Sequence, residues 1–301
     1  VQRQHNIQQW SIRQHEPWRG IGVQTLIYMD NVTQIDFSIA QLRPYINWLY
    51  FYHAWGLAGK PKSEKDKLLS EANAMLDQLQ SRYQTHALVG LFDANADGDD
   101  IVVGTERMPM LRQQRPSAPG APYLCLADFV RPLSSGIKDR VGVFAASIDE
   151  SIEHDFQQDD FQRMLAQTLA DRLAEATAEL VHLQVRRTIW GYAPDENLDI
   201  PQLLREDFQG IRPAVGYPSM PDTSLNFIID RLIGMKRIGI RLTDSGAMKP
   251  HASVSGLMFA HPKAHYFDIG RIDDTQLRDY ARRRHVPVEL MRRFLASRLV
   301  D

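Results

Sequence analysis

The chain has 301 residues, of which 44% are hydrophobic and 24% are charged, and its formal net charge is −2. This balance is typical of a globular protein with one large or two ordinary domains, and it excludes the disordered class. A net charge so close to zero argues against a nucleic-acid-binding protein, because such proteins are usually strongly basic. No segment approaches the roughly 20 apolar residues of a membrane-spanning helix, so we expect no membrane association.

The cysteine content and the chain start bear on the cellular setting. The single cysteine, Cys125, excludes an internal disulfide framework. The first residues also lack the charged and then apolar pattern of an export signal. We therefore expect a cytoplasmic location. Because the chain begins at Val1 rather than at methionine, we interpret it as a piece of a longer polypeptide.

The first half of the chain predicts one clear helix and several short strands. Residues 1–44 are rich in Gln and Arg and are expected to form an arm, in which residues 25–29 are apolar enough for a strand. Apolar residues recur at helical spacing over 63–83, behind Ser63 as a favourable N-cap. Strands are predicted from short apolar runs bounded by turn residues, over 87–92, 101–103, 123–130 and 141–145.

The second half contains the longest predicted helix, over about 160–187. Its apolar seam consists of Phe161, Leu165, Leu169, Leu173, Ala176 and Leu180. Further strands are predicted over 237–242, 253–259 and 265–269, and closing helices over 274–284 and 287–299. Because strands and helices do not alternate regularly, the pattern favours a single α+β domain over a doubly wound parallel sheet.

The segment from Arg212 to Pro221 predicts an ordered coil. Its three prolines and Gly216 fit neither a helix nor a central strand. Arg212 lies at the head of the coil and Tyr217 in its middle, with no other charge between them. We therefore expect the Arg212 guanidinium to be free to bind an anion such as a carboxylate. The alternative is an ordinary surface arginine in a proline-rich loop.

Three acidic residues on the long predicted helix form a second candidate site. Asp171, Glu175 and Glu179 are spaced by four residues and are offset from the leucine seam. This spacing predicts an acidic ridge opposite the buried face, with only Arg172 nearby to relieve the repulsion. The ridge is either a solvated helix face or a surface that awaits a cationic partner.

The coil, together with residues 205–211 before it, closely resembles the activation domain of cobalamin-dependent methionine synthase. The resemblance continues in the same order along most of the chain. It includes Ile46-Asn47-Trp48, Ala54-Trp55-Gly56-Leu57-Ala58-Gly59-Lys60, Leu124-Cys125-Leu126-Ala127-Asp128, Trp190-Gly191-Tyr192-Ala193-Pro194, Leu242-Thr243-Asp244-Ser245-Gly246 and Ala252-Ser253-Val254-Ser255-Gly256. An ordered series of this length is more specific than any lone motif.

The resemblance implies a fold and a function. The fold would be a single C-shaped α+β domain with a central twisted, mainly antiparallel sheet flanked by helices. It would comprise an arm over 1–44 and a body over 45–301, as the C-terminal module of a longer chain. The function would be to bind S-adenosylmethionine for the reductive methylation of cob(II)alamin to methylcobalamin, a reactivation step in methionine biosynthesis. Another domain or protein would hold the cobalamin, and flavodoxin or a similar reductase would donate the electron.

The resemblance also implies roles for individual residues. Those that would bind S-adenosylmethionine are Asn47, Arg212, Pro213, Ala214, Val215, Gly216, Tyr266 and Phe267. Tyr217 would face the corrin, while Asp171 and Glu175 would hold a histidine of the cobalamin-binding domain. Two positions depart from the family, which has an aspartate at Asn47 and a second tyrosine at Phe267. Both departures would weaken ligand binding, because an amide lacks charge and phenylalanine lacks a hydroxyl.

Other functions are less compatible with the sequence. No glycine-rich fingerprint links a strand to a helix, since Gly20-Ile21-Gly22 lacks the third glycine. The calcium-like run at 93–98 has Gly104 where a bidentate glutamate is required, so we expect no metal site. An alternative of another class is a free-standing, non-catalytic adaptor that binds another corrinoid protein and senses S-adenosylmethionine. A DNA-binding role ranks third.

Overall fold

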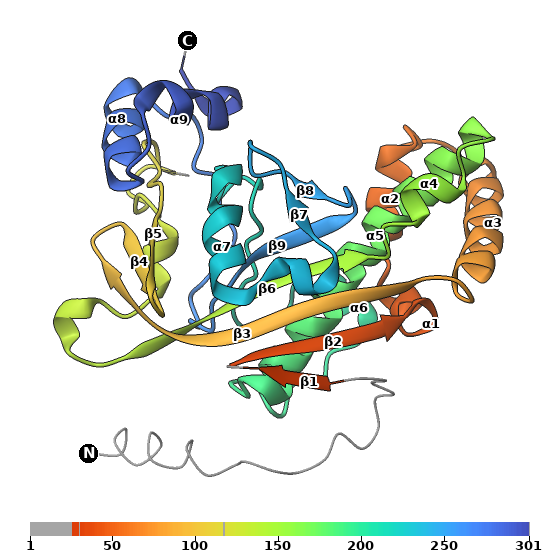
Figure 1. Ribbon diagram of the computed structural model, residues 1–301, viewed down its shortest axis with the longest axis horizontal. Coiled ribbons are helices and arrows are strands. Elements are labelled where there is room, and N and C mark those ends of the chain that lie inside the picture. Colours follow the sequence, from red (N-terminus) through yellow and green to blue (C-terminus); the bar gives the residue numbers. More distant parts are fainter. Residues whose placement is uncertain (1–25, 30, 117, 301) are drawn as a thin grey trace.

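The computed structural model describes residues 26–29, 31–116 and 118–300. Its centre is a curled seven-stranded sheet in which every pair of neighbours is antiparallel (Figure 1). The longest strand, β3, pairs with β2 and β4 along one edge and with β6 along the other. The strands are β1 (Leu26–Met29), β2 (Val32–Ser38), β3 (Gln84–Asp97), β4 (Asp100–Val103), β5 (Glu106–Pro109), β6 (Asp139–Ile148) and β9 (Ser253–Met258). Two short strands, β7 (Arg241–Leu242) and β8 (Met248–Lys249), pair separately.

Helices cover both faces of this sheet. Helix α5 (Asp160–Gln184) packs across β3, β6 and β9, and α7 (Asn226–Ile233) packs against the same strands with a different core cluster (Figure 1). Helices α8 (Asp274–Arg283) and α9 (Val288–Phe294) share a small third core at the C-terminal end. The remaining helices are α1 (Ile39–Leu42), α2 (Trp48–Ala54), α3 (Lys62–Leu79), α4 (Ile152–Asp155) and α6 (Ile200–Leu204).

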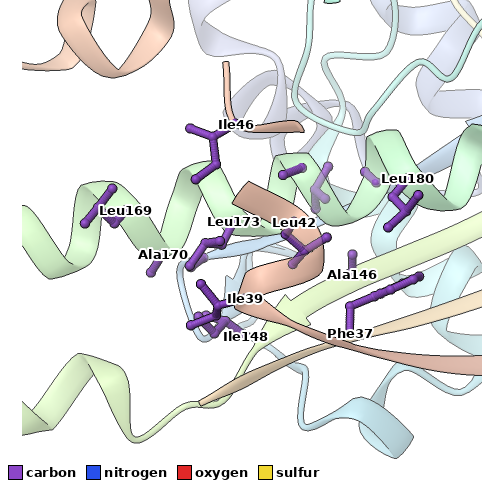
Figure 2. Packing of buried hydrophobic residues seen from close by; sticks show 14 of the residues in the cluster. Phe37, Ile39, Leu42, Ile46, Ala146, Ile148, Leu169, Ala170, Leu173 and Leu180 are labelled. Carbon is purple, nitrogen blue, oxygen red and sulfur yellow. The ribbon is translucent and has the colours of Figure 1, made fainter. Parts of the chain in front are cut away.

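Alternation along β6 explains how one sheet serves two cores. Phe144 and Ala146 join the cluster beneath α5, whereas Val143 and Ala145 join the cluster beneath α7. Successive side chains of a strand point to opposite faces, so an unbroken apolar run indicates burial on both sides. In Figure 2, labelled side chains of α5, α1, β2 and β6 meet in the first cluster; they include Leu169, Leu173, Leu180, Leu42, Phe37 and Ala146.

The N-terminal boundary differs from expectation. The expected arm over 1–44 is wrong from Val32 onward, because β2 and α1 are integral to the sheet and its core. Ile35, Phe37 and Leu42 are fully buried. The spacing of two between Ile35 and Phe37 is the strand signal, and it lies within a Gln-rich context that concealed it. The apolar run at 25–29 contains β1, while residues 1–25 lie outside the described part of the chain.

The long helix is confirmed over Asp160–Gln184, but several other element predictions are wrong. Residues 123–130 form no strand; a 3-10 helix, η3 (Leu126–Phe129), is closed where Cys125 N–H donates to the Asp128 carboxylate at 2.8 Å. Residues 265–269 are coil, and of residues 237–242 only Arg241–Leu242 form a strand, after a 3-10 helix that ends at Ile238. Helix α3 begins at Lys62, after Pro61 rather than after Ser63. Helix α7 and strand β5 were not predicted.

Candidate functional site

The coil that begins at Arg212 lies against the edge strand β9. The Pro213 carbonyl accepts from Leu257 N–H at 3.1 Å, and Val215 N–H donates to the Ser255 carbonyl at 2.9 Å. Between these bonds Ala214 faces Gly256 in an isolated antiparallel bridge. A side chain at Gly256 would collide with the coil, because its Cβ would lie 2.2 Å from the Pro213 oxygen. The sequence prediction of an ordered coil is therefore confirmed, and the order comes from β9.

A tight turn places Tyr217 at the tip of the coil. Gly216 has φ of 91°, a conformation that favours glycine, and its N–H donates to the Met220 carbonyl at 2.8 Å. The Tyr217 side chain is 49% exposed, yet its hydroxyl donates to the Glu175 carboxylate of α5. Partial burial and the nearby carboxylate raise the pKa of Tyr217 above its ordinary value. Tyr217 is thus a neutral phenol that joins the coil to α5.

The Arg212 side chain is not free, which corrects the sequence expectation. Its Nη2 lies 2.5 Å from Oε2 of Glu179, and the two side chains are only 13% and 6% exposed. Burial lowers the pKa of the guanidinium, but Glu179 and neighbouring acids more than offset this, so the net shift is upward. Charges along the coil itself gave no sign of this pairing, because Glu179 is 33 residues distant in the sequence. Arg212 therefore remains charged and is held in one orientation.

A neutral histidine lies on the other side of Arg212. His182 is fully buried on α5, with Nδ1 at 3.4 Å from Nη1 of Arg212 and Nε2 at 3.3 Å from the Tyr192 hydroxyl. Burial, with repulsion from Arg186 and Arg212, lowers the pKa of His182 well below its usual value. The imidazole can therefore accept from the guanidinium without adding charge. Sequence reasoning missed His182 because nothing in its local pattern distinguishes it from a core residue.

The acidic residues of α5 are not a uniform solvated ridge. Asp171 is exposed, Glu175 is half-buried, and Glu179 is buried beneath the coil. Arg212 and Tyr217 relieve the repulsion, rather than only Arg172. Partial desolvation by surrounding protein atoms and the neighbouring Glu175 raise the pKa of Asp171, although Arg172 opposes the shift. The prediction of a ridge opposite the buried face is wrong for Glu179, because the coil covers the last turns of α5.

Asn47 belongs to a segment that packs against α5. It caps α2, where its Oδ1 accepts from Leu49 N–H at 3.1 Å. The helix η2 (Arg43–Tyr45) just before it contacts α5. Within the described residues no hydrogen bond joins Asn47 to Arg212. The amide oxygen that was expected to accept a ligand ammonium is already used as a helix cap, although an oxygen has two lone pairs.

Tyr266 and Phe267 point in different directions. The Tyr266 hydroxyl accepts from Arg212 N–H at 3.0 Å, which places this ring at the head of the coil. Burial raises the pKa of Tyr266 to about 12. Phe267 instead packs against Phe129, with ring centroids 6.2 Å apart. Of the expected pair, the structure therefore brings only Tyr266 to Arg212, whereas Phe267 belongs to the core.

Two further features near Arg212 had no sequence signal. Glu206 has φ of 62°, which is uncommon for a residue with a side chain, and Arg212 and Glu179 both influence its pKa. A π-helical turn, η5 (Val185–Ile189), ends α5 and carries Arg186, which binds Glu196 through two bonds of 2.8 and 2.7 Å. Arg186 also stacks on Phe208 at 3.9 Å from the ring centroid. π-helical turns within α-helices are found frequently at functional sites.

The described part of the chain contains neither a metal cluster nor a membrane-spanning helix. Over these residues no group of three or more His, Cys, Asp or Glu side chains could hold a metal ion. No described helix is both long enough and apolar enough to cross a bilayer.

Comparisons with known proteins identify the family of the chain. A family model described as vitamin B12 dependent methionine synthase, activation domain, matches residues 38–285. Among solved structures, the crystal structure of the MetH reactivation domain bound to AdoHcy is similar, with a TM-score of 0.83 and 37% sequence identity. The alignment covers 95% of this chain and 95% of that chain. The expected α+β class and its curled antiparallel sheet are confirmed. This chain belongs to the family of activation domains of vitamin B12-dependent methionine synthase, a methyltransferase.

Proposed function

We propose that this domain binds S-adenosylmethionine at the Arg212 coil and directs its methyl group toward cobalamin held by another domain of methionine synthase. The observation that carries the proposal is the guanidinium of Arg212, buried and oriented by Glu179 at 2.5 Å. The similar solved domain was bound to AdoHcy, which is the product that S-adenosylmethionine leaves after methyl transfer. An oriented fork of N–H donors suits the carboxylate of such a ligand.

The coil would contribute its backbone to the adenine. Because the Pro213 carbonyl and Val215 N–H bind β9, the Ala214 N–H lies on the opposite edge of the coil. This N–H has no hydrogen-bond partner among the described residues. We assign it to the adenine edge, with Gly216 leaving room beside it, since no atom lies within 4 Å of a Cβ built there. Tyr266 would supply a flat wall at the head of the coil.

The reaction needs little chemistry from the protein itself. When bound, S-adenosylmethionine supplies an electrophilic methyl group: its sulfur–carbon bond breaks and a cobalt–carbon bond forms. The cob(II)alamin state requires one electron, which flavodoxin or a similar reductase would supply. The domain would contribute position, as proximity and orientation alone account for much of catalysis. Tyr217, at the exposed tip of the coil, would face the corrin.

Asp171 and Glu175 would form the contact with the cobalamin-binding domain. Asp171 is exposed on α5, and Glu175 is close enough to bind the Tyr217 hydroxyl. Two carboxylates beside the corrin-facing tyrosine would hold a protonated or hydrogen-bonding histidine from that domain. We propose that turnover needs this partner, so the domain alone would not complete a catalytic cycle.

A reconstitution assay tests the proposed function. The domain is mixed with a cobalamin-binding module in the cob(II)alamin state, a reductant and S-adenosylmethionine, and the visible spectrum is followed. We expect the spectrum of methylcobalamin to appear and to require all four components. Complex formation without methylcobalamin would contradict the proposal and favour the adaptor alternative.

A further inference from the structure

One carboxylate oxygen beside Arg212 is buried and unused. Oε2 of Glu179 binds the guanidinium, but Oε1 is sealed from solvent and has no hydrogen-bond partner among the described residues. The whole side chain is only 6% exposed. Buried polar atoms without a partner are rare and costly, and charged ones especially so. An acceptor in this position therefore calls for a donor from outside the chain.

The charges around Arg212 favour a cationic donor. Glu175, Glu179 and Glu206 all act on its pKa. His182, on the other side of the guanidinium, is held neutral by burial and by nearby cations. Arg212 thus faces three carboxylates, whereas Arg186, the other cation that acts on His182, is paired with Glu196. The site therefore retains negative charge after Arg212 is paired. A second positive group can enter at low electrostatic cost.

The charge of Glu179 also acts on the segment that precedes Asn47. Burial raises the pKa of Tyr45, and the negative charge of Glu179 adds to the shift. Tyr45 is two residues before Asn47 and belongs to η2, which contacts α5. Asn47 itself is uncharged and already caps α2. Because Glu179 is charged and its Oε1 has no partner among the described residues, it is the stronger acceptor of the two for a positive group.

We propose that Glu179 is a ligand-binding residue whose Oε1 accepts the α-ammonium group of the amino-acid tail. The carboxylate of the same tail would bind the N–H groups of Arg212 that Glu179 and His182 leave unused. The preformed Arg212–Glu179 pair would thus bind both the carboxylate and the ammonium group of the amino-acid tail. The inference rests on the proposed function, since it assigns a further contact to the same ligand.

Calorimetric titrations test this contact with two ligands, S-adenosylmethionine and its analogue with hydrogen in place of the α-amino group. For the wild-type domain we expect the analogue to bind at least about tenfold more weakly, as charge-assisted hydrogen bonds are strong. Glu179→Gln should bind S-adenosylmethionine about tenfold more weakly than the wild type does, and it should bind both ligands with similar affinity. Glu179→Asp, which keeps the charge, should keep the preference. Glu71→Gln removes an exposed charge from α3 and should behave as the wild type.

The outcomes separate this inference from the proposed function. If Glu179→Gln retains the wild-type preference for the amino group, the inference is overturned while ligand binding by the domain stands. If Glu179→Gln weakens both ligands equally, Glu179 only positions Arg212, and the inference again fails. If the wild-type domain binds neither ligand, the proposed function fails and the inference with it. Thermal unfolding of each variant shows whether a loss of ligand affinity comes from misfolding of the domain.

Discussion

Gly256→Ala should displace the ligand-binding coil without removing any side chain that contacts the ligand. In the wild-type backbone the added Cβ would lie 2.2 Å from the Pro213 oxygen and 2.9 Å from the Ala214 Cα, where ordinary contacts begin at 3.4 Å. The coil must therefore retreat by about 1 Å, which is the scale of misplacement that can cost about 100-fold in a positioned reaction. Two backbone hydrogen bonds to β9 would be strained. At about 0.5–1.5 kcal/mol each, their loss would cost about 1–3 kcal/mol of stability.

The assay combines urea unfolding with calorimetric titration of S-adenosylmethionine. Gly136→Ala is a matched control, because Gly136 has φ of 66° and no atom within 4 Å of its would-be Cβ. The control should lose about 1–2 kcal/mol of stability through left-handed strain alone. Only Gly256→Ala should also lose ligand affinity, by about tenfold or more. Wild-type affinity in Gly256→Ala, or equal losses in both variants, would refute the argument that β9 fixes the coil.

The remaining predictions concern two charged side chains, His86 and Arg212. His86 donates to Asp36 at 2.8 Å and to Asp149 at 3.0 Å, and these bonds raise its pKa from 6.5 to about 9. Because the folded-state pKa is the higher one, this contribution of about 3 kcal/mol is complete below pH 6.5 and is lost as pH rises toward 9. Unfolding free energies of wild type and His86→Gln should therefore converge above that pH; a constant difference would contradict the assignment. Arg212→Ala should cost about 3–5 kcal/mol of stability, since it leaves Glu179 buried and unpaired. Adding Glu179→Gln should recover part of that loss in denaturant unfolding, and no recovery would argue against the pairing.

The sequence predicted those parts of the fold that depend on local periodicity. Helix α5 follows from its leucine spacing, and β6 and β9 follow from their apolar runs. Residues 123–130 resemble β6 in composition, yet they form η3 because the Asp128 carboxylate binds Cys125 N–H and Arg112 anchors the same carboxylate. That outcome depends on a long-range ion pair, which no local pattern reports.

The candidate site was predictable in its parts but not in its connections. Arg212 and Tyr217 were identified from the coil, and Asp171 and Glu175 from their spacing on α5. The pairing of Arg212 with Glu179 was not, because it depends on how the coil crosses α5. The family resemblance implies a site role for both Tyr266 and Phe267, although adjacent side chains on an extended segment point to opposite sides. Its contact with Phe129 follows from that alternation.

A crystal structure of this domain with S-adenosylmethionine would test the central claim most directly. The account predicts the ligand carboxylate within hydrogen-bond distance of the Arg212 guanidinium, with the adenine on the free edge of the coil at Ala214. The methyl group should point toward the side where Tyr217 is exposed. Density for the ligand elsewhere on the molecule, with Arg212 bound only to Glu179, would contradict it.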